Sequence, residues 1–263
     1  MTGYEKNNDP LISIIMPVRN GGQFIGGSIR SVIAQTYENW ELVIVNDHSS
    51  DATSDIVKEF IKSDKRIRLI NLRGKRSGAA CSRRCAINNS RGSWIAFLDS
   101  DDKWAPEKLR LQMDEAGKSG SRLIFTASMF MDETGRLKNF VFHVPERIAY
   151  PEILKQDVIP CSSVLVRKDL LYDSFYETDN FLCDDYAAWI RILRDNGETA
   201  KGIDLPLLKY RISRTSLSYN KIKSSYRTYL TYRHVGLSVP AAVYYWCWYA
   251  VRSLKKYSGI YFE

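Results

Sequence analysis

Paired cysteine motifs, glycine-rich nucleotide loops and membrane-length apolar runs are all missing from this sequence of 263 residues. The five cysteines are scattered and include no CxxC pair, which favours free thiols in a reducing compartment over a zinc site or a disulfide framework. No GxGxxG, GxxxxGK[ST], GxSxG or HExxH motif occurs, so a dinucleotide fingerprint, a phosphate loop, a nucleophile elbow and a zinc-protease helix are not supported. The first ten residues lack a basic and then apolar signal segment, so we expect a protein that is not secreted.

The composition is that of a globular protein with an uneven charge. Hydrophobic residues make up 44% and charged residues 26%, which excludes a disordered, a collagen-like and a polytopic membrane chain. The net charge is +8, but residues 201–263 hold eleven Lys and Arg against Asp204 and Glu263, a net +9. The first 200 residues are therefore close to neutral. The same C-terminal part contains ten of the sixteen tyrosines, so any charged partner is to be sought there.

Strand-like and helix-like patterns alternate over roughly the first 130 residues. Short apolar runs predict strands at residues 11–17, 41–46, 66–72, 94–98 and 123–131. Apolar residues at helical spacing predict helices at residues 22–36, around 56–61, at 78–89 and at 106–117, the last opened by Pro106. Later segments predict a strand at 162–167, a helix at 185–196, a strand at 205–212 and helices at 219–234 and 239–257. This alternation predicts an α/β fold with a mostly parallel sheet and helices on both faces.

Three carboxylates follow the predicted strand at residues 94–98, namely Asp99, Asp101 and Asp102. Carboxylates this close repel one another unless a cation or hydrogen-bond donors compensate. Mg²⁺ and Mn²⁺ prefer such oxygen ligands and often share them with substrate phosphates. Ligands of parallel sheets bind beyond the carboxyl ends of the strands, so the position favours a metal site over a solvated turn in which Asp102 caps a helix.

Three further polar segments are candidate site residues, and each also has a simpler explanation. Asp47 follows the second strand and can accept hydrogen bonds from a ribose or a base, whereas residues 49–51 suit a helix cap. Asp185 can act as a general base, but acidic residues are also favoured at the start of any helix. Residues 211–218 combine arginines with hydroxyls, which suits a diphosphate or an ordinary polar loop.

Taken in order, these segments resemble the inverting nucleotide-sugar glycosyltransferases of family 2, which have the GT-A fold. The similar segments are residues 11–20 (LISIIMPVRN), 31–40 (SVIAQTYENW), 45–53 (VNDHSSDAT), 78–102, 183–189 (CDDYAAW) and 210–221 (YRISRTSLSYNK). Three positions depart from the family pattern: Arg19 replaces an aromatic residue, Arg84 an asparagine and Asp184 a glutamate.

The resemblance implies a GT-A catalytic domain at residues 1–218, with a nucleotide-binding half at 10–132 and an acceptor half at 133–218, followed by basic, aromatic-rich helices at 219–263. It implies inverting transfer from a nucleotide-diphosphate sugar, expected to be a UDP-sugar, to a hydroxyl of a glycan or lipid-linked acceptor. The expected context is the synthesis of cell-surface polysaccharide or lipopolysaccharide.

The resemblance also implies roles for individual residues. Asp185 is expected to be the catalytic base, Asp101 with Asp99 to hold Mg²⁺ or Mn²⁺, and Asp47 to face the base of the nucleotide. Asp99 is also expected to face the ribose. The other expected substrate-binding residues are Pro17, Val18, Arg19, Asn20, Gly78, Arg83, Ser100, Asp184, Trp189, Arg211, Ser216 and Ser218.

Residues 235–251 form an uncharged run of seventeen residues rich in Tyr and Trp. As a helix this run would reach ~25 Å, short of a ~30 Å bilayer core. Its aromatic residues, followed by Arg252, Lys255 and Lys256, suit a membrane interface. We therefore expect a cytoplasmic protein that attaches peripherally to the anionic inner face of the cell membrane through residues 219–257. Packing against the catalytic domain or a second subunit is the alternative.

Two other functions compete with sugar transfer. A nucleotidyltransferase of similar fold also uses an acidic metal cluster, but residues 17–22 are a poor match to its glycine-rich basic loop. A nucleic-acid-binding protein would explain the basic tail, but the acidic cluster would repel phosphates, so no nucleic-acid partner is expected. The sequence leaves the oligomeric state open.

Overall fold

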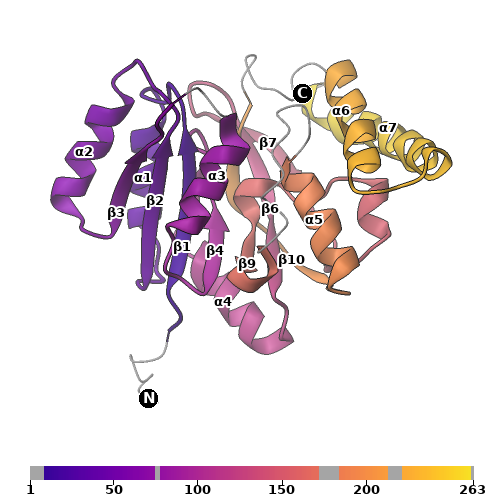
Figure 1. The fold of residues 1–263 in the computed structure, drawn as a ribbon, viewed down its shortest axis with the longest axis horizontal. Coiled ribbons are helices and arrows are strands. Elements are labelled where there is room, and N and C mark those ends of the chain that lie inside the picture. The colour runs from indigo at the N-terminus through magenta and orange to yellow at the C-terminus, as the bar shows by residue number, and fades with distance from the viewer. Residues whose placement is uncertain (1–8, 75–77, 172–183, 213–220, 262–263) are drawn as a thin grey trace.

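A computed structural model describes residues 9–74, 78–171, 184–212 and 221–261. In this part of the chain a ten-stranded sheet has the order β3-β2-β1-β4-β9-β6-β10-β5, with β7 paired to β6 and β8 to β10 (Figure 1). The strands are β1 (Ile12–Val18), β2 (Trp40–Asn46), β3 (Ile67–Asn71), β4 (Trp94–Phe97), β5 (Lys103–Trp104), β6 (Leu123–Met131), β7 (Leu137–Phe142), β8 (Arg147–Ile148), β9 (Leu165–Arg167) and β10 (Ala200–Arg211). The helices are α1 (Ile25–Ile33), α2 (Thr53–Ser63), α3 (Gly78–Asn88), α4 (Lys108–Ser119), α5 (Asp184–Asp195), α6 (Lys221–His234) and α7 (Val239–Tyr261).

The sheet is mostly parallel. Strands β3, β2, β1, β4, β6 and β10 run in one direction, and β9 lies antiparallel between β4 and β6. Adjacent residues of β1 face opposite sides: Ile14 belongs to a core with α1 and α4, and Ile15 to a core with α3 and α5. Helices therefore cover both faces, as the unbroken apolar strands predict. The GT-A-like α/β architecture expected from the sequence is confirmed.

Most predicted elements are present, with three corrections. Helix α4 begins at Lys108, and Pro106 lies in the preceding turn, where the Lys108 amide donates to the carbonyl of Ala105. The strand expected at residues 162–167 is shorter, because Cys161–Ser163 form a 3₁₀ turn before β9. Strands β5, β7 and β8 were not predicted. Two of these strands are only two residues long, and β7 is a largely half-exposed edge strand, so none has a long apolar run.

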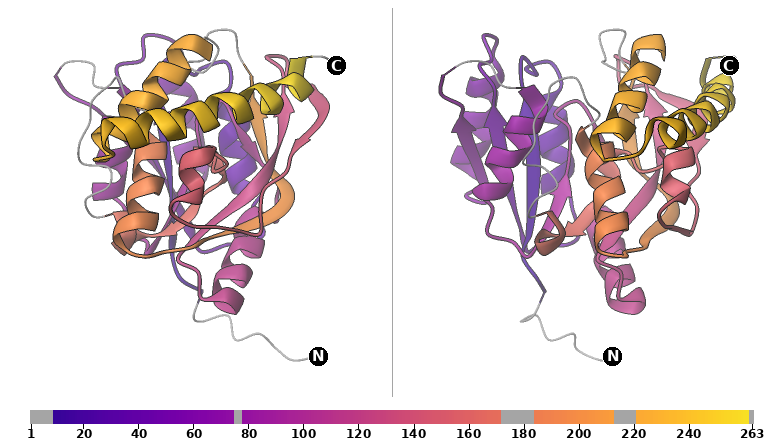
Figure 2. Two further views of the ribbon diagram at one scale, coloured as in Figure 1. Left: turned by 90° about the vertical axis from the view of Figure 1, so that its right-hand side faces the viewer. Right: turned by 45° about the vertical axis from the view of Figure 1, so that its right-hand side comes forward.

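The C-terminal helices pack against the rest of the chain, with α7 lying across α6 (Figure 2). Tyr232 of α6 is fully buried, and its hydroxyl donates to the Leu154 carbonyl at 2.6 Å and lies 3.1 Å from the Tyr186 hydroxyl. The indole of Trp246 in α7 donates to the Ser225 carbonyl at 2.9 Å. One side of α6 and one side of α7 are therefore covered by packing within the chain. Among the described residues, no helix is long and apolar enough to cross a membrane.

Candidate active site

The loops after β1 and β2 are tied together by side-chain to main-chain hydrogen bonds. The Asn20 amide donates to the Ser49 hydroxyl at 2.9 Å, and the Asn20 side-chain oxygen accepts from the Ser50 amide at 2.8 Å. Asn20 has a φ of 49°, a left-handed conformation that asparagine tolerates better than most residues. Pro17 and Val18 end β1 and are buried, whereas Arg19 is exposed. Asn20 therefore fixes the loop after β1 against the loop after β2.

Asp47 and Gly78, both expected in the substrate site, are brought together. Asp47 is 3% exposed, and its Oδ2 accepts a hydrogen bond of 2.8 Å from the amide of Gly78. Its own amide donates to the carbonyl of Val18 at 2.9 Å. Gly78 has a φ of 84°, a region that favours glycine, and it starts α3. Through its amide and its carboxylate, Asp47 therefore connects the end of β1 to the start of α3.

The acidic loop lies directly after β4, at the centre of the sheet. Burial and the nearby Asp99 carboxylate raise the pKa of Asp101 to about 6. Burial and the charges of Asp101 and Asp99 raise the pKa of Asp102 well above its usual value. Asp102 is 1% exposed, its Oδ1 accepts from the Arg211 amide, and its Oδ2 has no hydrogen-bond partner in the described part of the chain. Burial and mutual repulsion therefore disfavour the charged forms of Asp101 and Asp102.

Arg83 connects this loop to the predicted base. Its guanidinium Nη2 forms an ion pair of 2.7 Å with Oδ1 of Asp99, and the side chain is only 10% exposed. Burial lowers the pKa of Arg83, but Cys161, Asp99 and Asp185 raise it, with a net rise. Asp185 at the start of α5 therefore lies within electrostatic reach of Arg83, as does Asp99 after β4. Arg83 and Asp185, about a hundred positions apart in the sequence, therefore interact electrostatically.

Arg211 and Trp189 were expected to contact the substrate, but both contact other parts of the protein. Arg211 donates from Nε to the Asp101 carbonyl at 2.9 Å and from Nη1 to the carbonyls of Asp132 and Glu133, so it braces main chain instead of standing open to phosphates. Trp189 is fully buried, with its ring edge-on to Phe97 at 5.8 Å between centroids. Direct contact of Trp189 with a substrate is not compatible with this burial. We interpret both as positioning residues.

Two buried serines support the acidic loop and were not predicted. The hydroxyl of Ser28 in α1 donates to the carbonyls of Ser100 and Asp102 at 2.8 and 2.6 Å. The hydroxyl of Ser162 accepts from the Asp99 amide at 3.1 Å. A serine within an apolar pattern gives no sequence signal for such a role. Ser216 and Ser218, expected at the phosphates, lie outside the described residues, and so does Cys183.

The chemistry of the acidic loop fits a divalent cation. Asp99 and Asp101 supply oxygen ligands whose mutual repulsion a cation would relieve, and Mg²⁺ commonly takes one or two carboxylates together with substrate phosphates. Within the described residues, no group of three or more His, Cys, Asp and Glu side chains is arranged to hold a metal by itself.

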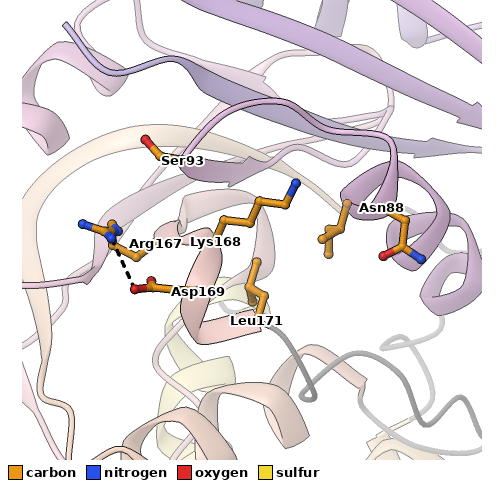
Figure 3. Close-up of a pocket in the computed structure, with 7 residues that line it drawn as sticks. Asn88, Ser93, Arg167, Lys168, Asp169 and Leu171 are labelled. Atoms are coloured by element: carbon orange, nitrogen blue, oxygen red, sulfur yellow. Dashed lines mark hydrogen bonds and ion pairs between the residues drawn. The ribbon is translucent and has the colours of Figure 1, made fainter. Parts of the chain in front are cut away.

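A pocket of about 440 Å³ lies at the other end of β4, away from this site (Figure 3). It is lined by residues from the end of α3, the start of β4 and the turn after β9, including Asn88, Ser93 and Lys168. Arg167 and Asp169 at its edge form an exposed ion pair of 3.2 Å (Figure 3). Ligands of such sheets bind at the carboxyl ends of the strands, so this pocket is not part of the candidate site.

The aspartate loop directly after β4 and the acidic start of α5 carry the candidate site residues, and the loop lies at the carboxyl ends of the parallel strands. Residues 13–166 match the model of the family described as Glycosyl transferase family 2. The chain belongs to this family, and the protein is a glycosyltransferase. Membership of this family supports sugar transfer over nucleotidyl transfer and nucleic-acid binding.

Relatives match over nearly the whole chain. WfgD of Escherichia coli, named as a UDP-Glc:alpha-D-GlcNAc-diphosphoundecaprenol beta-1,3-glucosyltransferase, is 36% identical over 251 residues, which cover 95% of this chain and 96% of that protein. TuaG of Bacillus subtilis, a glycosyltransferase assigned provisionally to teichuronic acid biosynthesis, is 33% identical over 252 residues, covering 95% of this chain and 98% of that protein.

Solved structures match the fold at lower sequence identity. Residues 1–349 of Staphylococcus aureus TarS in complex with UDP-GlcNAc give a TM-score of 0.68 at 18% identity, covering 88% of this chain and 69% of that one. The mannosyltransferase PcManGT of Pyrobaculum calidifontis, in complex with GDP-Man and Mn²⁺, gives a TM-score of 0.63 at 15% identity, covering 89% of this chain and 67% of that one.

Proposed function

We propose that this glycosyltransferase moves a sugar from a UDP-sugar to a hydroxyl of a lipid-linked glycan acceptor, with inversion, in the synthesis of a cell-surface polysaccharide. The match to WfgD over nearly the full length of both chains is the main support, because that relative is named for a UDP-glucose donor and a diphosphoundecaprenol-linked acceptor. The TarS complex with UDP-GlcNAc is consistent with a uridine nucleotide in this fold.

Donor binding is assigned to the loops that follow β1, β2 and β4. We assign Asp47 to the base of the nucleotide and Asp99 to the ribose. Asp99 and Asp101 would hold Mg²⁺ or Mn²⁺ against the diphosphate, and the cation would offset the charge that develops on the leaving group. Arg83, which is largely buried beside Asp99, adds a fixed positive charge on the same side.

Asp185 is assigned as the general base. The acceptor oxygen attacks the anomeric carbon, the bond from that carbon to the diphosphate oxygen breaks, and its electron pair leaves with the diphosphate. The proton of the acceptor hydroxyl passes to the carboxylate of Asp185. Attack from the face opposite the leaving group inverts the configuration in a single displacement.

The acceptor defines where the protein works. A lipid-linked acceptor is confined to a membrane, so we propose that the protein acts at the cytoplasmic face of the cell membrane, to which its basic C-terminal part is attracted. The charge of that part is a net +9 over residues 201–263, which suits an anionic surface.

The test is a donor screen with the purified full chain. UDP-glucose, UDP-galactose, UDP-GlcNAc and GDP-mannose are each supplied with a GlcNAc-diphosphate-lipid acceptor and Mg²⁺ or Mn²⁺, and release of free nucleotide is measured with and without a chelator. The anomeric configuration of the product is read by NMR. Chelator-sensitive transfer from a UDP-sugar with inversion is expected. A preference for GDP-mannose, or a product that retains the donor configuration, would contradict the proposal.

A further inference from the structure

One face of α7 is apolar and exposed. In the described part of the chain nine large hydrophobic side chains are exposed, and five of them lie on α7. They are Val239 (51%), Val243 (43%), Tyr244 (54%), Trp248 (42%) and Val251 (64%). These residues, with the exposed thiol of Cys247, repeat at spacings of three to four and so share one side of the helix. We call this set the outer stripe of α7.

The opposite side of α7 is used for packing within the chain. Ala242 is fully buried, the indole of Trp246 donates to Ser225, and the ring of Tyr249 lies 6.4 Å from that of Tyr186. α7 also packs against α6 and against the 3₁₀ helix at Glu152–Lys155. The inner side therefore holds α7 in place, and the outer stripe is left without a partner among the described residues.

The charge beside the outer stripe is of one sign. Arg252 is exposed one turn after Trp248, with its guanidinium carbon 5.7 Å from the centre of that ring. Lys255 and Lys256 follow within α7, and no Asp or Glu occurs from residue 205 to residue 262. A partner that covers the stripe therefore meets apolar and aromatic side chains on a helix whose sequence carries charge of positive sign only.

We propose that the outer stripe of α7 docks on an anionic lipid bilayer, with the helix lying in the plane of the interface. Valines can enter the acyl boundary, Tyr and Trp favour the headgroup level, and Arg and Lys attract anionic lipid. From Val239 to Val251 the stripe is ~18 Å long, a length suited to lying on a membrane and too short to span one. The choice of a bilayer over a protein partner rests on the proposed lipid-linked acceptor.

The position of α7 in the fold agrees with this orientation. α6 and α7 lie at the upper end of the molecule, toward which β1 runs from the N-terminus (Figure 1). The candidate site lies beyond the carboxyl ends of β1 and β4. The helix that carries the stripe therefore lies toward the same end of the molecule as the carboxyl ends of these strands (Figure 1).

Co-sedimentation of the full chain with vesicles tests the proposal. The vesicles contain phosphatidylcholine alone or an equal mixture with phosphatidylglycerol. The full chain should bind the mixed vesicles, and added salt should weaken this binding without abolishing it. The double variant Tyr244→Ser/Trp248→Ser should bind at least ~10-fold more weakly, because it loses both interfacial aromatic residues. The matched control is Leu137→Ser/Leu205→Ser, which removes two exposed apolar side chains outside α7 and should bind as the unchanged chain does.

Arg252→Gln separates charge from apolar contact. It should weaken binding to mixed vesicles, reduce the salt dependence and leave weak binding to neutral vesicles unchanged. Circular dichroism of each variant confirms that the fold persists, as expected for exposed positions.

Three outcomes would overturn the proposal. The first is that mixed vesicles do not capture the full chain, and the second is that the α7 double variant binds as well as the control. The third is a dimer, detected by light scattering, that Trp248→Ser dissociates, without any vesicle binding, which would make the stripe a subunit interface. Vesicle binding needs no substrate, so a chain that binds vesicles but transfers no sugar would contradict the proposed function and leave this inference standing.

Discussion

The main-chain amide of Arg211 donates a hydrogen bond of 2.8 Å to Oδ1 of Asp102, a residue 109 positions earlier in the chain. The guanidinium of Arg211 also holds the carbonyl of Asp101 at 2.9 Å. β10 ends at Arg211 and pairs antiparallel with β5, which follows the acidic loop directly. The end of β10 therefore fixes both the main chain and one side chain of the loop that is expected to hold the cation.

Replacing Arg211 should loosen this loop without unfolding the protein. Arg211→Met should lower kcat by ~10- to 100-fold, because a small displacement of positioned groups has a large effect on rate. It should also raise the metal concentration needed for half-maximal activity. Arg211→Lys should not restore activity, since a single ammonium cannot reproduce a planar guanidinium that donates to three carbonyls. Metal titration of the transfer rate is the measurement. Lys209→Met, two residues earlier in β10, is the control, and an equal effect in both variants would contradict a specific role for Arg211.

Asp101→Asn should separate metal binding from stability. Metal-dependent transfer should be abolished, because one of the two expected ligands loses its charge. In the presence of a chelator at pH 8, the free energy of unfolding should rise by up to ~3 kcal/mol, since burial and Asp99 raise the pKa of Asp101 to about 6 and each pKa unit corresponds to about 1.4 kcal/mol. Urea denaturation measures this change. The exposed Asp114→Asn in α4 should change neither quantity, and near-normal transfer by folded Asp101→Asn would refute the metal assignment.

Asp185→Asn tests the assigned base against its neighbour. The amide keeps the shape of the carboxylate but cannot take a proton, so turnover should fall by at least ~10²-fold. Binding of the donor, measured by calorimetry, should persist. Asp184→Asn is the matched control at the adjacent position of α5. If Asp184→Asn proves the more damaging change, the base has been assigned one residue too late.

Because Lys108 is buried, we expect the free energy of unfolding to depend on pH. It is fully buried, donates to the Gln112 side-chain oxygen at 2.7 Å and lies 4.1 Å from the centre of the Trp104 ring. Burial lowers the pKa of Lys108 well below its usual value, so the unfolded chain binds one more proton than the folded chain until pH rises past the unfolded pKa. The free energy of unfolding should therefore rise with pH between 7 and 9, by at most ~1.4 kcal/mol per pH unit.

Lys108→Met should remove this part of the slope. Urea denaturation of both chains at several pH values is the measurement, and only the difference in slope is compared, because methionine also leaves the Gln112 oxygen without its donor. Lys118→Met, an exposed position on the same helix, should keep the slope of the unchanged chain. Parallel slopes for Lys108→Met and the unchanged chain would show that Lys108 stays protonated when buried.

The order of strands and helices could be predicted because each depends on a local pattern. β1 and β2 are unbroken apolar runs, and α1 and α5 repeat apolar residues at helical spacing. Local pattern fails where an element is short or only half buried, as in β5, β7 and β8. Local pattern also does not predict the direction of a strand in the sheet. Nothing in residues 165–167 indicates that β9 runs antiparallel to β4.

The acidic loop and Asp47 could be predicted as site residues because their position after a strand already places them at the ligand-binding edge of a parallel sheet. What surrounds them could not. The Arg83–Asp99 ion pair, the Ser162 hydroxyl that holds Asp99 and the bracing of Asp101 by Arg211 join segments that are distant in sequence. Periodicity reports which face of an element is apolar, but it does not report which other element that face meets.

The sequence by itself therefore determined the α/β class, the carboxylates beyond the strand ends and the basic, aromatic character of the C-terminal part. Only the tertiary structure decided that Trp189 is buried against Phe97, that Arg211 braces main chain, and that α7 packs through one side and exposes the other. The reason is physical. Composition and spacing fix what each residue can do, whereas burial, pKa and partners depend on which distant groups the packed core brings within a few ångströms.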